Sequence, residues 1–116
     1  MAQLALDPTA LDAAAVAFFA VLSSPIRLAV LRLLLDGERR VSDLVAALGI
    51  PQPRLSNHLA CLRHCGFVTV RRRGPFLHYA LADPRVGDLI CLGSRLAEPT
   101  ADALQSCNVL EGEREA

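Results

Sequence analysis

Two cysteines, Cys61 and Cys65, are the residues of this chain whose spacing most clearly suggests chemistry. They are four positions apart, so on a helix their thiols lie one above the other on the same face. Two thiolates at that spacing can bind one soft metal ion. The alternative interpretation is packing, because free cysteines are among the most buried residues in proteins.

The sequence contains no arrangement typical of an enzyme. There is no Ser/His/Asp set, no glycine-rich phosphate loop and no pair of carboxylates at catalytic spacing. An enzyme would have to use Cys61 or Cys65 as its nucleophile and His64 or His58 as its base. We therefore expect a binding protein.

A second group of residues, just before the cysteine pair, is suited to nucleic acid. Its side chains are types that hydrogen-bond to base edges and phosphates: Gln52, Arg54, Ser56, Asn57 and His58. Leu55, Leu59 and Leu62 recur at helical spacing and should face the core, which turns Ser56 and Asn57 elsewhere. A merely solvated helix face is the alternative.

The charge distribution favours the nucleic-acid interpretation. The chain has twelve basic and twelve acidic residues, but residues 44–82 hold five arginines and no acid. Three of these arginines are consecutive: Arg71, Arg72 and Arg73. A basic middle between acidic ends is typical of a surface that meets a polyanion. We therefore expect DNA binding, and a thiol pair on a DNA-reading helix favours a metal site over packing.

Length and composition indicate one small domain. The chain has 116 residues, of which 53% are hydrophobic, so it can fold around a core. Its longest apolar run, residues 13–22, is shorter than the roughly 20 residues that cross a bilayer. We expect a cytoplasmic protein with no membrane partner and with reduced cysteines. The predicted parts are a flexible arm (residues 1–8), a domain (residues 9–97) and a tail (residues 98–116).

The pattern of apolar residues predicts a mainly α fold with a β-hairpin wing. Helices are expected at 9–22, 25–35, 43–48, 52–65 and 84–97, with Ser24 and Ser42 as N-caps of the second and third. Strands are expected at 67–70 and 76–81, joined by an arginine-rich loop at 71–75. A short helix, a turn with Gly49 and a longer helix form a helix-turn-helix, whose second helix enters the major groove.

Four segments of the sequence resemble the ArsR/SmtB family of winged-helix repressors. They are Leu22-Ser-Ser-Pro-Ile-Arg-Leu28, Ser42-Asp-Leu44, Leu55-Ser-Asn-His-Leu59 and Tyr79-Ala-Leu-Ala-Asp83. The resemblance implies a homodimer, joined through its first and last helices, that binds an inverted-repeat operator and releases it when an inducer binds. It matches Ser56, Asn57 and His58 to the recognition helix and Arg71–Arg73 to the wing.

The recognition helix and its cysteines resemble the cadmium- and lead-sensing CmtR-type branch of that family. The resemblance implies that Cys61 and Cys65 bind the metal together with a tail cysteine, here Cys107, from the other subunit. Three thiolates favour Cd(II) or Pb(II) over zinc, which prefers four ligands, and arsenite is another candidate. The alternatives are an arsenite- or thiol-redox-responsive repressor and a winged-helix module without an inducer site. Cys91, among apolar neighbours, is expected to pack near the dimer interface.

Overall fold

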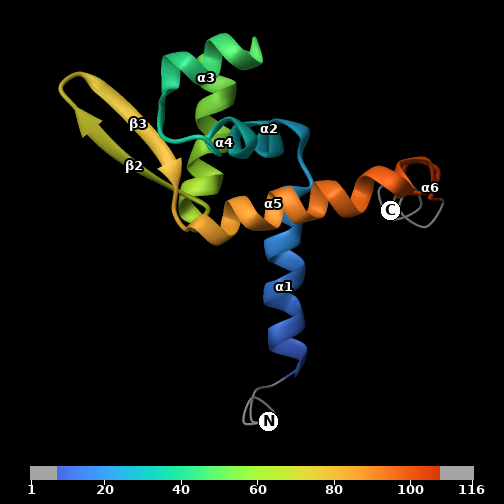
Figure 1. Ribbon diagram of the computed structural model, residues 1–116. Helices are drawn as coiled ribbons and strands as arrows, with labels where there is room; N and C mark the ends of the chain where they lie inside the picture. The colour runs from blue at the N-terminus through green and yellow to red at the C-terminus, as the bar shows by residue number, and fades with distance from the viewer. Residues whose placement is uncertain (1–7, 108–116) are drawn as a thin grey trace.

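The computed structural model describes residues 8–107 (Figure 1). Its elements are α1 (Pro8–Leu22), α2 (Pro25–Leu33), β1 (Arg39–Arg40), α3 (Val41–Leu48), α4 (Gln52–His64), β2 (Val68–Arg73), β3 (Phe76–Leu81), α5 (Pro84–Ala97), the 3-10 turn η2 (Glu98–Thr100) and α6 (Ala101–Gln105). The expected mainly α fold with a hairpin wing is confirmed. Most of the predicted arm, and the tail beyond Cys107, lie outside the described residues.

The first helix extends away from the body of the molecule. In Figure 1, α1 (blue) points away from the other helices, and its side chains from Asp12 to Ala20 are exposed.

Ser24 caps α2 as predicted, since its hydroxyl accepts a hydrogen bond from Arg27 N at 3.2 Å, with Pro25 at the start of the helix. Within the described residues no single helix is long and apolar enough to cross a membrane, although α1 and α2, bent by 79°, pass that test as a pair by length and composition.

The core is formed around α2, α3 and α4. The leucine stripe predicted on α4 is buried: Leu55, Leu59 and Leu62 are at most 1% exposed. They pack with Leu31 of α2 and Leu44 of α3 in one cluster of buried residues. This cluster fixes the rotation of α4, so the side chains opposite the leucines are turned to solvent.

The helix-turn-helix starts two residues earlier than expected. The prediction that Ser42 caps α3 is wrong, because Val41 is already helical and Arg40 is the N-cap. The cause is Asp43, whose carboxylate accepts a hydrogen bond from the backbone N–H of Arg40 at 3.2 Å. Gly49 ends α3 with a φ of 66°, a left-handed conformation that glycine adopts without strain.

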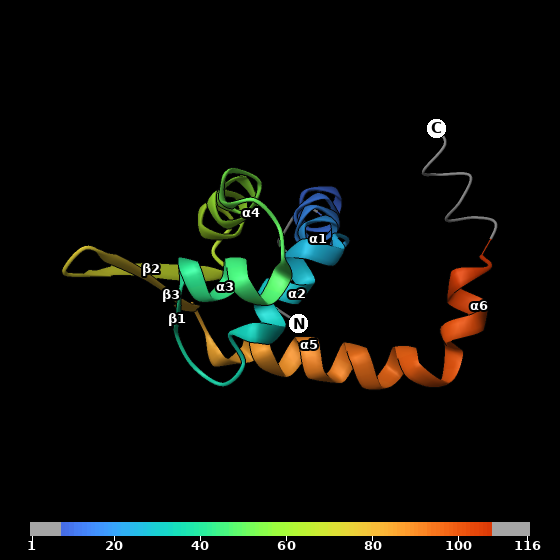
Figure 2. The same cartoon turned by 90° about the horizontal axis from the view of Figure 1, so that it is seen from above.

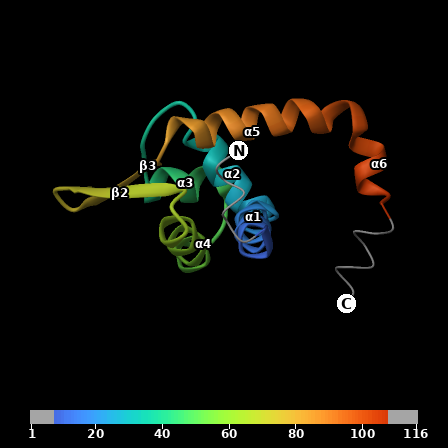
Figure 3. The same ribbon diagram turned by 90° about the horizontal axis from the view of Figure 1, so that it is seen from below.

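A three-stranded antiparallel sheet in the order β1-β3-β2 forms the wing. The prediction of an arginine-rich loop is wrong, since Arg71–Arg73 belong to β2 and Arg73 pairs directly with Phe76. The connection is only Gly74 and Pro75, with Gly74 at a φ of 59°. The strand β1 was not expected, because two residues are too few for a sequence pattern. In Figure 3 the hairpin extends well beyond the helices.

The last long helix runs along one side of the molecule. Asp83 caps α5 and accepts a hydrogen bond from Arg85 N at 2.8 Å. Gly87 is buried, and a side chain there would meet Leu35 and Leu81 within 3.1–3.3 Å. After η2 the chain turns into α6, which lies at the opposite end of α5 from the wing (Figure 2).

Candidate functional site

The helix α4 presents the predicted DNA-contacting side chains on its solvent side. Its first two turns carry four exposed polar residues: Gln52, Arg54, Ser56 and Asn57. The helix begins with Pro51 as its N-cap and Pro53 in the first turn, where a missing N–H costs nothing. The first part of α4 therefore offers amide, hydroxyl and guanidinium groups without a competing acid on the same helix.

His58 differs from its neighbours because it is half-buried and contacts α2. Arg27 Nη1 lies 3.4 Å from His58 Nδ1, and Arg27 Nε donates to the carbonyl of Val21 at 2.6 Å. Burial lowers the pKa of His58, and the positive charges of Arg27 and Arg54 lower it further. A neutral His58 ring can accept a hydrogen bond from Arg27, which itself donates to Val21 at the end of α1. Arg27 therefore links α4 to α1.

The wing arginines are not equivalent. Glu38, in the loop before β1, pairs with Arg71 at 3.0 Å and with Arg73 at 3.1 Å. Arg72 forms no ion pair with any residue between 8 and 107. His78 of β3 also lies beside Glu38, with its Nδ1 3.5 Å from Oε1. Residues 44–82 contain no acid, but in the fold Glu38 from outside this stretch pairs with two of its arginines.

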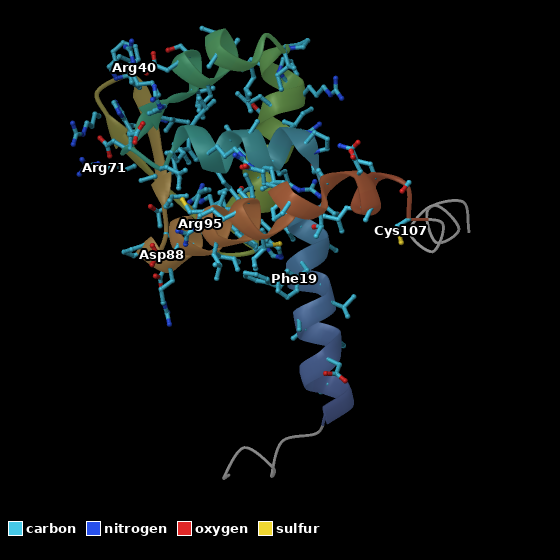
Figure 4. The ribbon with its side chains drawn as sticks, turned by 45° about the vertical axis from the view of Figure 1, so that its right-hand side comes forward. Phe19, Arg40, Arg71, Asp88, Arg95 and Cys107 are labelled. Carbon is cyan, nitrogen blue, oxygen red and sulfur yellow. The ribbon has the colours of Figure 1, made fainter. Side chains whose placement is uncertain are left out.

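A groove between the wing and the start of α4 contains residues that the sequence analysis missed. It has a volume of about 230 Å³ and is lined by Arg40, Ser42, Gln52 and Phe76, among others. Arg40 lies over the Phe76 ring, 4.7 Å from its centroid. Figure 4 shows Arg40 and Arg71 at this end of the molecule. The adjacent pair Arg39-Arg40 was visible in the sequence, but only β1 brings it beside the wing.

The thiols of Cys61 and Cys65 are close together and accessible. Cys65 is exposed and Cys61 half-buried, and both are free. Partial burial raises the pKa of Cys65, as do the charge and hydrogen bond of the neighbouring Cys61 thiol, whereas Arg27 opposes the shift. Cys65 also lines a groove of about 350 Å³ with Ala17, Phe18 and other α1 residues. A soft ion could reach these sulfur atoms from solvent and would displace their protons on binding.

The third predicted ligand, Cys107, is not near this pair. Figure 4 shows it just past α6, at the other end of the molecule from the wing, and in Figure 2 α6 is well separated from α4. Within residues 8–107 no group of three or more His, Cys, Asp or Glu side chains could hold one metal ion. A three-thiolate site that uses Cys107 therefore needs a second chain or a different conformation.

The arrangement of α3, the Gly49 turn, α4 and the β2–β3 hairpin defines the chain as a winged helix-turn-helix protein, a DNA-binding class. Comparison with known proteins agrees. Residues 24–70 match the family "Bacterial regulatory protein, arsR family". The "Probable mercury resistance operon repressor" of Streptomyces lividans is 47% identical over 98 residues, which cover 84% of this chain and 78% of that protein. The chain belongs to the arsR family of bacterial regulatory proteins.

Two further relatives agree with that assignment. The HTH-type transcriptional regulator CmtR of Mycobacterium tuberculosis is 45% identical over 62 residues, or 53% of this chain and 52% of that protein. The solution structure of a homodimeric winged helix-turn-helix DNA-binding domain from Mycobacterium bovis has a TM-score of 0.72 at 31% identity and covers 78% of this chain and 83% of that one. Because the family consists of transcriptional regulators, the expectation of a protein that is not an enzyme is confirmed.

Proposed function

We propose that this protein is a metal-responsive transcriptional repressor that binds operator DNA as a homodimer and releases it when Cys61 and Cys65 bind a soft metal ion. One observation carries the proposal. The two accessible thiols lie at the C-terminal end of α4, Cys61 in its last turn and Cys65 as its C-cap, and the first turns of the same helix present polar side chains to solvent. An ion that binds at one end of α4 can therefore change how its other end meets DNA.

In the DNA-bound form, the α4 helices of two subunits enter successive major grooves of an inverted repeat, about 34 Å apart. Ser56 and Asn57, with Gln52 and Arg54 beside them, hydrogen-bond base edges and nearby phosphates. His58 holds α4 against Arg27. The cationic wing, which carries Arg71, Arg72 and Arg73, adds contacts to the phosphate backbone, so binding weakens steeply as salt is raised.

The homodimer is supported by apolar surface on α1 and α5. Val16 and Phe19 of α1 are 68% and 57% exposed, and Leu96 of α5 is 66% exposed. A mainly apolar groove of about 270 Å³, lined by Phe19, Leu89 and residues of α2, runs between these helices. Burying such surface between two copies removes it from water at roughly 25 cal/mol per Å². The Mycobacterium bovis relative is itself homodimeric.

The inducing ion is chosen by the thiol ligands. Two thiolates at the C-terminal end of α4 select soft ions, and a third from the partner's tail would complete the site that Cd(II) and Pb(II) prefer. Mercury is a further candidate, because the Streptomyces lividans relative is named for mercury resistance and Hg(II) is satisfied by two thiolates. Coupling between effector and DNA sites typically amounts to about 1–3 kcal/mol, a 5–150-fold loss of DNA affinity.

The experiment is fluorescence anisotropy with the DNA upstream of the protein's own gene. We expect salt-dependent binding, and release by cadmium, lead or mercury but not by magnesium. Cys61→Ser and Cys65→Ser should abolish release while leaving metal-free binding intact. Cys91→Ser is the matched control, since Cys91 is an exposed thiol on α5 outside the pair.

Three results would contradict parts of the proposal. Release that persists in the Cys61→Ser and Cys65→Ser variants would exclude the thiol pair. Release by peroxide or arsenite, but by none of the metals, would favour the thiol-redox or arsenite alternative. The absence of binding to any duplex DNA would leave a winged-helix module with another role.

A further inference from the structure

The carboxylate of Glu38 contacts two arginines and one histidine of the wing. Arg71 donates two hydrogen bonds to it, from Nε to Oε2 at 3.0 Å and from Nη2 to Oε1 at 3.2 Å. Arg73 Nη2 lies 3.1 Å from Oε1, and His78 Nδ1 lies 3.5 Å from the same oxygen. One half-buried acid from outside the hairpin therefore contacts side chains of both β2 and β3.

Strand geometry explains why Arg72 is left out of this cluster. Successive side chains on a strand point to opposite faces, so Arg71 and Arg73 share one face of β2 and Arg72 lies on the other. The register agrees, since Arg71 pairs with His78 whereas Arg72 pairs with Leu77. Glu38 can thus reach the first and third arginines of the run but not the second.

We propose that Glu38 withholds Arg71 and Arg73 from DNA phosphates, so that Glu38 sets the contribution of the wing to DNA affinity and Arg72 is the wing arginine that is free to bind. This inference rests on the DNA binding proposed above. Glu38 is a positioning residue, because it acts on DNA through the two arginines rather than by touching it.

DNA phosphates can compete with the Glu38 carboxylate for Arg71 and Arg73. The side chains of these two arginines are 59% and 55% exposed, so each ion pair with Glu38 is screened by water and is weak. A DNA backbone competes for the same guanidinium groups with one negative charge per roughly 1.7 Å. Removing the carboxylate should therefore strengthen DNA binding by about 2- to 30-fold per protomer at low salt.

The test compares Glu38→Gln with wild type on a nonspecific duplex, using anisotropy over a series of KCl concentrations. Each arginine released to a phosphate adds about 0.9 to the slope of log affinity against log salt. The expected slope is steeper by up to about 1.8 per protomer. Asp36→Asn is the matched control, because Asp36 is an exposed acid in the same loop and its loss changes the net charge equally. An unchanged slope, or an equal change in Asp36→Asn, would overturn the proposal.

A second comparison begins in the wild-type background, and this first part does not depend on how well Glu38→Gln folds. With Glu38 present, Arg71→Ala should reduce the salt slope clearly less than Arg72→Ala, which should reduce it by about 0.9 per protomer. In the Glu38→Gln background the two alanine variants should have equal effects. Equal effects in the wild-type background would refute the withholding of Arg71. If wild type itself binds no duplex, the proposed DNA binding fails instead, so the two failures are distinguishable.

Discussion

Two defective variants of this protein, when mixed, should restore a metal site that neither has alone. The first variant is Cys61→Ser/Cys65→Ser, which keeps Cys107, and the second is Cys107→Ser, which keeps the thiol pair. Cys107 lies beyond α6, and α6 is joined to the rest of the chain by the 14 residues of α5, a helix of about 21 Å. A Cys107 that reaches the pair must therefore come from the partner subunit in the conformation seen here.

The size of the effect follows from counting subunits. When equal amounts of the two variants exchange at random, about half of the dimers are mixed. A mixed dimer has one complete site, made of the pair from one subunit and Cys107 from the other. The mixture should therefore bind about one three-thiolate ion per four protomers, against one per protomer for wild type.

The assay is a titration with Pb(II), followed by the ultraviolet bands of sulfur-to-lead charge transfer. The Cys61→Ser/Cys65→Ser variant alone should give no such band, and Cys107→Ser alone should give only the weaker absorption of two thiolates. Wild type mixed with Cys91→Ser serves as the control for the mixing procedure and should keep full binding. A mixture with no more three-thiolate signal than the separate variants would refute the shared site.

Three further predictions concern the fold and its pH dependence. Leu59→Ala should lower the free energy of unfolding by about 2–5 kcal/mol in urea titrations, because Leu59 is 1% exposed in the core and its loss leaves a cavity. Arg27→Ala should raise the pKa of His58 in NMR titrations, whereas Arg27→Lys, which keeps the charge, should leave it low; an unmoved pKa in Arg27→Ala would contradict the contact. Hydrogen bonds from Arg85 lower the pKa of Asp83 to about 2, so the stability that Asp83 contributes is fully present above pH 3.8 and is lost as the pH falls towards 2. The difference in melting temperature between wild type and Asp83→Asn should shrink over that range, and a constant difference would be the contrary result.

The proposed metal site should also depend on pH, through the protons that its thiols must lose. The raised pKa of Cys65 means that its thiol is protonated at neutral pH. Metal binding must therefore release protons and should strengthen as the pH rises. Proton release measured in weakly buffered solution checks this, and metal affinity that is independent of pH would argue against thiolate ligands.

The sequence by itself determined the features that depend on near neighbours. The leucines of α4 recur at helical spacing, so their burial could be predicted from periodicity. Ser24 and Asp83 cap helices through hydrogen bonds to residues two or three positions away. The stacked thiols follow from a four-residue spacing on a helix. These interactions are local, and local geometry is set by residue type and order.

Only the tertiary structure decided which groups from distant segments meet. The sequence marked Arg71–Arg73 as three similar cations, but the fold of the loop before β1 places Glu38 against two of them. The sequence likewise could not tell that Cys107 lies at the far end of the molecule from the wing, because its position depends on the direction of α5 and α6. Such contacts are fixed by how helices pack around the shared core, and packing depends on many residues at once.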